Sequence, residues 1–102
     1  MDQSSFELLR RQTDQLRRNF IDTDIDTAMT FVQLARTEVK VGDQQHASNL
    51  LFAARHAHET IARFLDSVTD PEEKQRLTER FQVLGHAIDG VELLQGHPKV
   101  KS

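Results

Sequence analysis

Apolar residues recur every three or four positions along almost the whole chain, and no segment shows sustained alternation with a period of two. This spacing is typical of amphipathic helices that bury one face. The sequence therefore predicts an all-α fold. We expect an antiparallel bundle of three long helices over residues 24–95 and an additional N-terminal helix over 5–20, in a single domain spanning 1–102 whose tail, 96–102, is frayed.

The predicted N-terminal helix has a narrow apolar stripe. Ser4, followed three residues later by Glu7, has the pattern of a capping box at its start. The tetrapeptide at 9–12, Leu-Arg-Arg-Gln, is echoed at 16–19 as Leu-Arg-Arg-Asn. A seven-residue echo is the spacing of a coiled-coil seam. The stripe consists of Phe6, Leu9, Thr13, Leu16 and Phe20.

The segment 21–27 interrupts the helical pattern with β-branched residues and Asp. Both residue types are poor in helix interiors, and Asp and Thr favour N-caps. The composition predicts a break here, with a new helix starting near Asp24. The alternative is one continuous helix from 5 to 41, because the apolar spacing nearly carries across the segment.

Two junctions have clear turn chemistry. Gly42 is the expected stop of one helix and Asp43 the N-cap of the next, so we expect an antiparallel hairpin there. Asp70 and Pro71 begin the last helix as N-cap and first helical residue. The predicted apolar faces consist of Ala28, Phe31, Val32, Ala35 and Val39; Ala47, Leu50, Leu51, Ala54, Ala57, Ile61, Leu65 and Val68; and Leu77, Phe81, Leu84, Ile88 and Val91.

Residues 28–62 resemble a tetratricopeptide-type helical hairpin. The small residues Ala35, Ala47 and Ala54, the apolar Leu51 and the Gly-Asp turn fall where that repeat places them. The chain has no second copy, and the second helix runs on without the usual terminal proline. A single hairpin followed by a third helix, over 25–95, resembles the three-helix bundle of microtubule-interacting-and-trafficking (MIT) domains. That resemblance implies inter-helix grooves that bind peptides of partner proteins.

Composition narrows the function classes further. The 102-residue chain has 13 basic and 16 acidic residues, a net charge of −3, which does not favour a dedicated nucleic-acid binder. It has no cysteine, so disulfides, thiol catalysis and cysteine-ligated zinc are excluded. No apolar run approaches the roughly 20 residues that span a bilayer, and no signal peptide is evident. The expected location is cytoplasmic.

The histidines offer the main candidate chemistry. His58 falls on the apolar face of its helix and is interpreted as a core residue near Thr27 and Asp24. His56 falls on the opposite face, so the two cannot chelate one ion, and no metal site or cofactor is expected.

The alternative to a binding role is an enzyme, a phosphotransfer module that uses His86, or a metal-binding bundle. His86 with Gly90 partly matches a phosphotransfer motif, but Asp89 stands where that motif has lysine. Arg80 and His86 also match the loose spacing of HEPN-type ribonucleases. The acidic run at 22–26 opens like a calcium loop, but lacks the glycine and glutamate that such a loop needs.

The surface residues favour a non-catalytic module for protein–protein interaction or self-association. Phe52 lies on the polar side of its helix beside His56, and we expect the N-terminal helix to cover it, within one chain or across a homodimer. The candidate partner-binding residues are Phe52, His56, Arg10, Arg11, Arg17 and Arg18.

Overall fold

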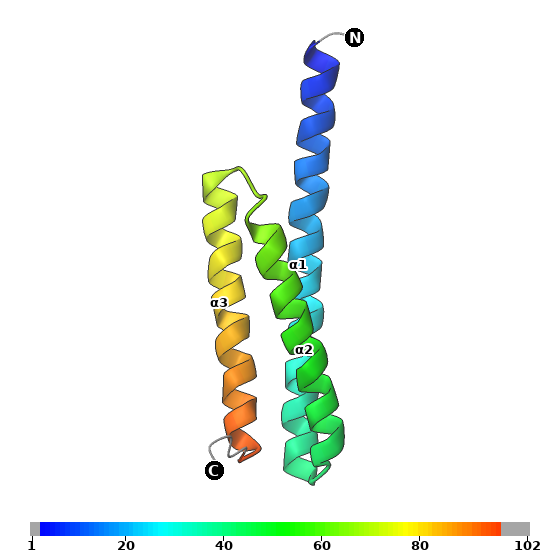
Figure 1. The fold of residues 1–102 in the computed structure, drawn as a ribbon, viewed down its shortest axis with the longest axis vertical. Coiled ribbons are helices and arrows are strands. Elements are labelled where there is room, and N and C mark those ends of the chain that lie inside the picture. The colour runs from blue at the N-terminus through cyan, green and yellow to red at the C-terminus, as the bar shows by residue number, and fades with distance from the viewer. Residues whose placement is uncertain (1–2, 97–102) are drawn as a thin grey trace.

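The computed structural model describes residues 3–96, which form three helices and no strand. Helix α1 spans Gln3–Val41, α2 Gln44–Leu65 and α3 Pro71–Leu94. Consecutive helices run antiparallel, and every pair of helices is in contact (Figure 1). The predicted all-α antiparallel bundle is therefore confirmed, with three helices rather than four.

The predicted break at 21–27 is wrong, because α1 is helical throughout. Ile21 and Ile25, one turn apart, are both fully buried in the core, so this segment is held in the bundle. On an adjoining face, Asp22 accepts hydrogen bonds from Arg76 and Arg80 of α3, and Asp26 accepts one from Arg80. These tertiary contacts outweigh the low helix propensity of the segment.

The separate N-terminal helix is likewise not found, because residues 5–20 are the first part of α1. Residue Gln3 is already helical, so Ser4 lies inside the helix rather than at an N-cap. The buried core begins at Ile21 instead of residue 24. Most of the predicted tail, residues 97–102, lies outside the described part of the chain.

The predicted turns are confirmed. Gly42 adopts a φ of 89°, and the amides of Gly42 and Asp43 donate to the Val39 and Glu38 carbonyls, as in a Schellman motif. The Asp43 carboxylate caps α2 by accepting from the His46 amide at 3.0 Å. Asp70 caps α3 in the same way. Both junctions thus satisfy helix-end groups that would otherwise lack partners.

The core runs along the axis of the bundle and is entirely apolar among the described residues. Four alanines of α1 and α2 are fully buried, and their small side chains permit close packing of these two helices: Ala28, Ala35, Ala47 and Ala54. Leu50, Ala57, Phe31, Val39 and Phe81 of the predicted faces are only partly buried and pack against the core. The fully or nearly buried residues are Ile21, Ile25, Ala28, Val32, Ala35, Ala47, Leu51, Ala54, Ile61, Leu65, Val68, Leu77, Leu84, Ile88 and Val91.

Helix α1 is much longer than its neighbours and projects past them at its N-terminal end (Figure 1). The α2–α3 connection contacts α1 at Asp14 and Arg18, so residues 3–13 extend beyond the bundle. At 1.5 Å per residue, this N-terminal extension is about 16 Å long. It contributes about 16 Å to the longest dimension of the molecule, which measures 60 × 22 × 19 Å.

Candidate interaction surface

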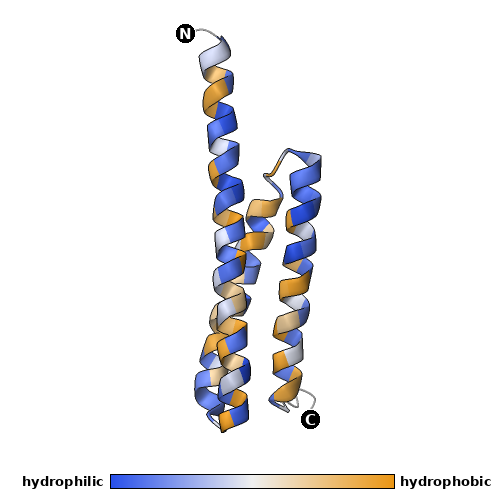
Figure 2. Ribbon diagram, turned by 180° about the vertical axis from the view of Figure 1, so that it is seen from behind, coloured by the Kyte–Doolittle hydropathy of each residue, from blue (hydrophilic) through white to orange (hydrophobic). Residues whose placement is uncertain are grey.

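Every residue from 3 to 13 is exposed, including the apolar ones. The exposed fractions of Phe6, Leu9 and Leu16 are 54%, 56% and 69%. Together with Thr13 they form one stripe along α1, here called the seam: Phe6, Leu9, Thr13 and Leu16. Orange apolar bands interrupt the hydrophilic blue of the projecting helix (Figure 2). The seam is therefore an exposed apolar stripe that no other part of residues 3–96 covers.

The base of the extension is fastened to the bundle. Phe20, the last residue of the predicted stripe, packs edge-to-face on Phe64 of α2, with ring centroids 5.2 Å apart. The Thr69 hydroxyl donates to Asp14 Oδ2 at 3.0 Å. Residues 55 positions apart meet here, so no local sequence signal could have identified the contact. These contacts fix the direction in which the seam projects.

A hollow of about 430 Å³ lies along the seam at this junction. Three seam residues, Phe6, Leu9 and Thr13, form its apolar side. The remaining lining residues are Arg10, Asp14, Arg17 and Thr69, the last of which belongs to the α2–α3 connection. The hollow thus combines an apolar wall with a charged border.

The four predicted arginines lie together on α1, but they are not equivalent. Arg18 approaches Asp70 and Glu73 at 3.9 and 3.8 Å, which ties it to the start of α3. Arg17 pairs with Asp14 on its own helix at 3.2 Å. Within residues 3–96, no hydrogen bond or ion pair is found for Arg10 or Arg11, and both are exposed. Those two side chains are therefore open to solvent.

Phe52 and His56 do not join this surface. Phe52 is 76% exposed, so the expectation that the N-terminal helix covers it within one chain is wrong. The cause is the continuity of α1, which carries residues 3–13 beyond the bundle instead of folding them back over α2. Because α2 runs antiparallel from the turn at Gly42, Phe52 lies beside the C-terminal half of α1. Phe52 and the exposed His56 form a second, separate candidate surface.

His58 is half-buried between α2 and α3, but its partners differ from those predicted. Its ring stacks on Phe81 of α3, with centroids 4.0 Å apart and planes 10° from parallel, rather than meeting Thr27 or Asp24. Burial lowers the pKa of His58, and the nearby Arg55 adds to this, against an opposing hydrogen bond to the Phe81 backbone. A Cβ at Gly85 would lie 3.0 Å from His58 Nε2, which explains a glycine in mid-helix.

The lowered pKa predicts a pH-dependent stability. Below the ordinary histidine pKa of 6.5, the unfolded chain takes up a proton at His58 before the folded chain does. The free energy of unfolding should therefore fall as the pH drops from 6.5 toward the lower folded pKa. We expect His58→Gln to reduce the slope of the free energy of unfolding against pH in this range. The reduction corresponds to the uptake of at most about one proton on unfolding. Urea unfolding of both proteins from neutral to mildly acidic pH measures it, and equal slopes would contradict the assignment.

The candidate catalytic residues are not brought together. His86 is exposed on α3, whereas Arg80 turns toward α1 and pairs with Asp22 and Asp26. The Arg80–His86 spacing therefore does not build a shared site. Asp89, beside His86 in the partial phosphotransfer motif, pairs with Arg55 of α2 at 2.9 Å.

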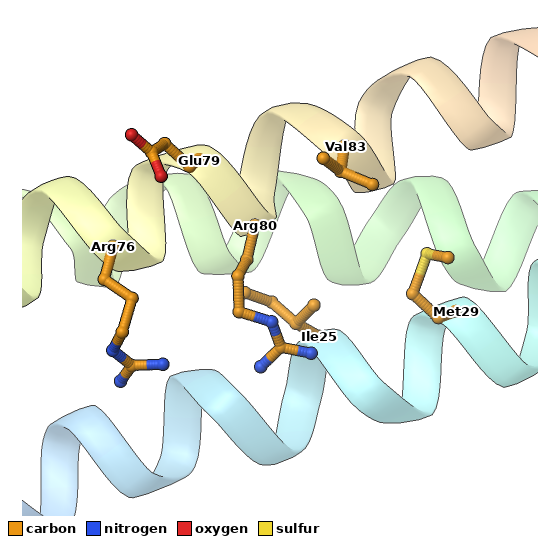
Figure 3. A pocket seen from close by; sticks show the side chains of 6 residues that line it. All are labelled: Ile25, Met29, Arg76, Glu79, Arg80 and Val83. Atoms are coloured by element: carbon orange, nitrogen blue, oxygen red, sulfur yellow. The ribbon is translucent and has the colours of Figure 1, made fainter.

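A second hollow, of about 300 Å³, lies between α1 and α3. Ile25, Met29 and Val83 supply apolar surface, and Arg76 and Arg80 reach from α3 toward α1 across it (Figure 3). The hydrogen bond from Arg76 is the largest factor that lowers the pKa of Asp22, the shared acceptor of both guanidinium groups. These arginines bridge the groove and connect α3 to α1 through their ion pairs with Asp22.

One group of potential metal ligands could not be identified from the sequence, because its members lie on both sides of a turn. Ligand atoms of Glu38, Asp43 and His46 lie within 4.8 Å of one another. Asp43 is already the N-cap of α2, and Glu38 lies 3.5 Å from His46 Nδ1. The cluster is accounted for by the α1–α2 junction itself.

The chain matches no protein-family model, no curated protein and no solved structure. Among residues 3–96, no helix has the length and apolar character needed to cross a bilayer.

Proposed function

We propose that the chain is a non-catalytic helical module for protein–protein interaction, and that it binds another helix along the seam of α1. The observation that carries this is the exposure of a coiled-coil-type stripe on a helix whose base contacts the bundle through Asp14 and Phe20. Exposed apolar residues at heptad spacing are stabilised when a second helix packs against them. The occupant is another protein or a second copy of this chain.

The bundle supports this role because it already contains the helix from which the seam extends. An isolated helix of eleven residues is unstable in water because nucleation is unfavourable. Here the extension propagates from a helix already formed in the core, so the seam is ordered before a partner arrives. Less conformational entropy is then lost on binding.

The second candidate surface and the wider assignments stay predictions. Phe52 and His56 offer an anchor on α2 that is independent of the seam. The resemblance to tetratricopeptide and MIT-type bundles, the cytoplasmic location and the absence of catalysis were expected from the sequence. None of them is needed for the seam to bind a helix.

Site-specific photo-crosslinking in the host cell tests the proposal. A benzophenone amino acid at Leu9 should give one discrete adduct, and Leu16→Gln in the same chain should abolish it because the seam is interrupted. Leu8 is the matched control, since it is similarly exposed but lies off the seam. An adduct of twice the 11.7 kDa chain mass identifies a second copy, and an adduct of any other mass identifies another protein. Equal, diffuse labelling from both positions would contradict the proposal.

A further inference from the structure

The border of the seam is basic, although the chain as a whole is acidic. Arg18 is tied to the start of α3, and without it residues 3–17 contain three arginines against Glu7 and Asp14, a local charge of +1 on a chain of net charge −3. Arg10 and Arg17 line the same hollow as Phe6, Leu9 and Thr13, seven residues apart along α1. Cations flank the apolar wall at the positions where coiled coils place the charges that select a partner.

This charge pattern disfavours a second copy as the occupant. Pairing two seams would bring two stretches of charge +1 together, and like charges along a helix interface select against pairing. A membrane surface fits less well, because the extension has neither Trp nor Lys and its Leu8 lies off the seam. An amphipathic helix with acidic residues beside its apolar face complements both the apolar wall and its basic border.

We propose that the seam docks an amphipathic helix of another protein whose apolar face is flanked by Glu or Asp. The partner's carboxylates lie beside Arg10 and Arg17, and its apolar residues fill the hollow beside Phe6, Leu9 and Thr13. Thr69 of the α2–α3 connection also lines this hollow. This inference rests on the proposed function and adds the chemical class of the partner.

Two synthetic amphipathic peptides test it with the full chain. Both have about three heptads with Leu and Ile on the apolar face, and they differ only in having Glu or Lys at the positions that flank this face. Fluorescence anisotropy should show that the Glu peptide binds about tenfold more tightly than the Lys peptide at low salt. The preference should shrink at about 0.5 M salt, where ion pairs are screened.

Charge reversal sharpens the test. The double variant Arg10→Glu, Arg17→Glu should bind the Lys peptide in preference to the Glu peptide. Arg36→Glu is the matched control, because Arg36 is an exposed arginine of α1 within the bundle and away from the seam. It should keep the wild-type preference. Circular dichroism establishes that all three proteins remain equally helical.

The other outcomes separate this inference from the proposed function. Equal binding of both peptides, lost in Leu9→Gln, overturns the acidic partner and leaves a helix-binding seam. Self-association, or binding to phosphatidylserine vesicles, that Leu9→Gln abolishes overturns it in favour of that occupant. If the chain is monomeric and binds neither peptide nor vesicles, the acidic partner is refuted, and the crosslinking result decides whether the seam binds any helix.

Discussion

Thr23→Pro is expected to lower the free energy of unfolding by about 3 kcal/mol or more, because Thr23 lies in the interior of a continuous α1. Proline removes the amide that donates to the carbonyl of Asn19, and its ring clashes with that carbonyl. The resulting kink displaces Ile21 and Asp22 from their contacts with the rest of the bundle. Thermal and urea unfolding followed by circular dichroism measure the loss.

Thr23→Ala is the matched control, since the Thr23 side chain is exposed. It should change stability by no more than about 0.5 kcal/mol. A break before Asp24 would reverse the expectation, because proline is tolerated in a connection that precedes an N-cap. Equal stability of the proline and alanine variants would therefore show that α1 is two helices.

The same residues explain why the sequence misplaced this boundary. Asp22 and Asp26 read as capping residues when only their neighbours in sequence are considered. Their partners, Arg76 and Arg80, lie 54 to 58 positions away, so the ion pairs that hold the segment helical have no local signature. The continuous alternative was visible only in the apolar spacing, which Ile21 and Ile25 do satisfy.

By contrast, α2 and α3 were predictable because their ends are determined locally. Asp43 and Asp70 each accept hydrogen bonds from amides two or three residues ahead. The buried faces followed from helical spacing alone. The partner of His58 did not, because the stack on Phe81 depends on how α3 lies against α2.

For the candidate site, the sequence indicated the apolar stripe and the arginines, but it assigned the stripe to covering Phe52 rather than to a surface that projects from the bundle. The narrow stripe and the arginines were both visible. What the sequence could not give was the length by which α1 outruns its neighbours, which depends on where α2 ends and the chain turns back. Because of that length, Phe6, Leu9 and Leu16 face solvent, whereas Phe20 reaches Phe64.

Leu84→Ala and Leu16→Ala should separate the leucines that fold the chain from those left for a partner. Leu84 is fully buried among the three helices, whereas Leu16 is 69% exposed. Truncating Leu84 removes apolar contacts and leaves a cavity, which should lower the free energy of unfolding by about 2–5 kcal/mol. Truncating Leu16 in the isolated chain should cost less than about 0.5 kcal/mol.

Urea unfolding of the two variants and the wild type, at two protein concentrations, measures both effects. A large loss in Leu16→Ala that grows with protein concentration would mean that the seam is already covered by a second copy in solution. A concentration-independent loss would mean that the extension folds back on its own bundle. A loss of less than about 0.5 kcal/mol in Leu16→Ala would mean that folding does not depend on the apolar area of the seam. That area is then available to stabilise a complex.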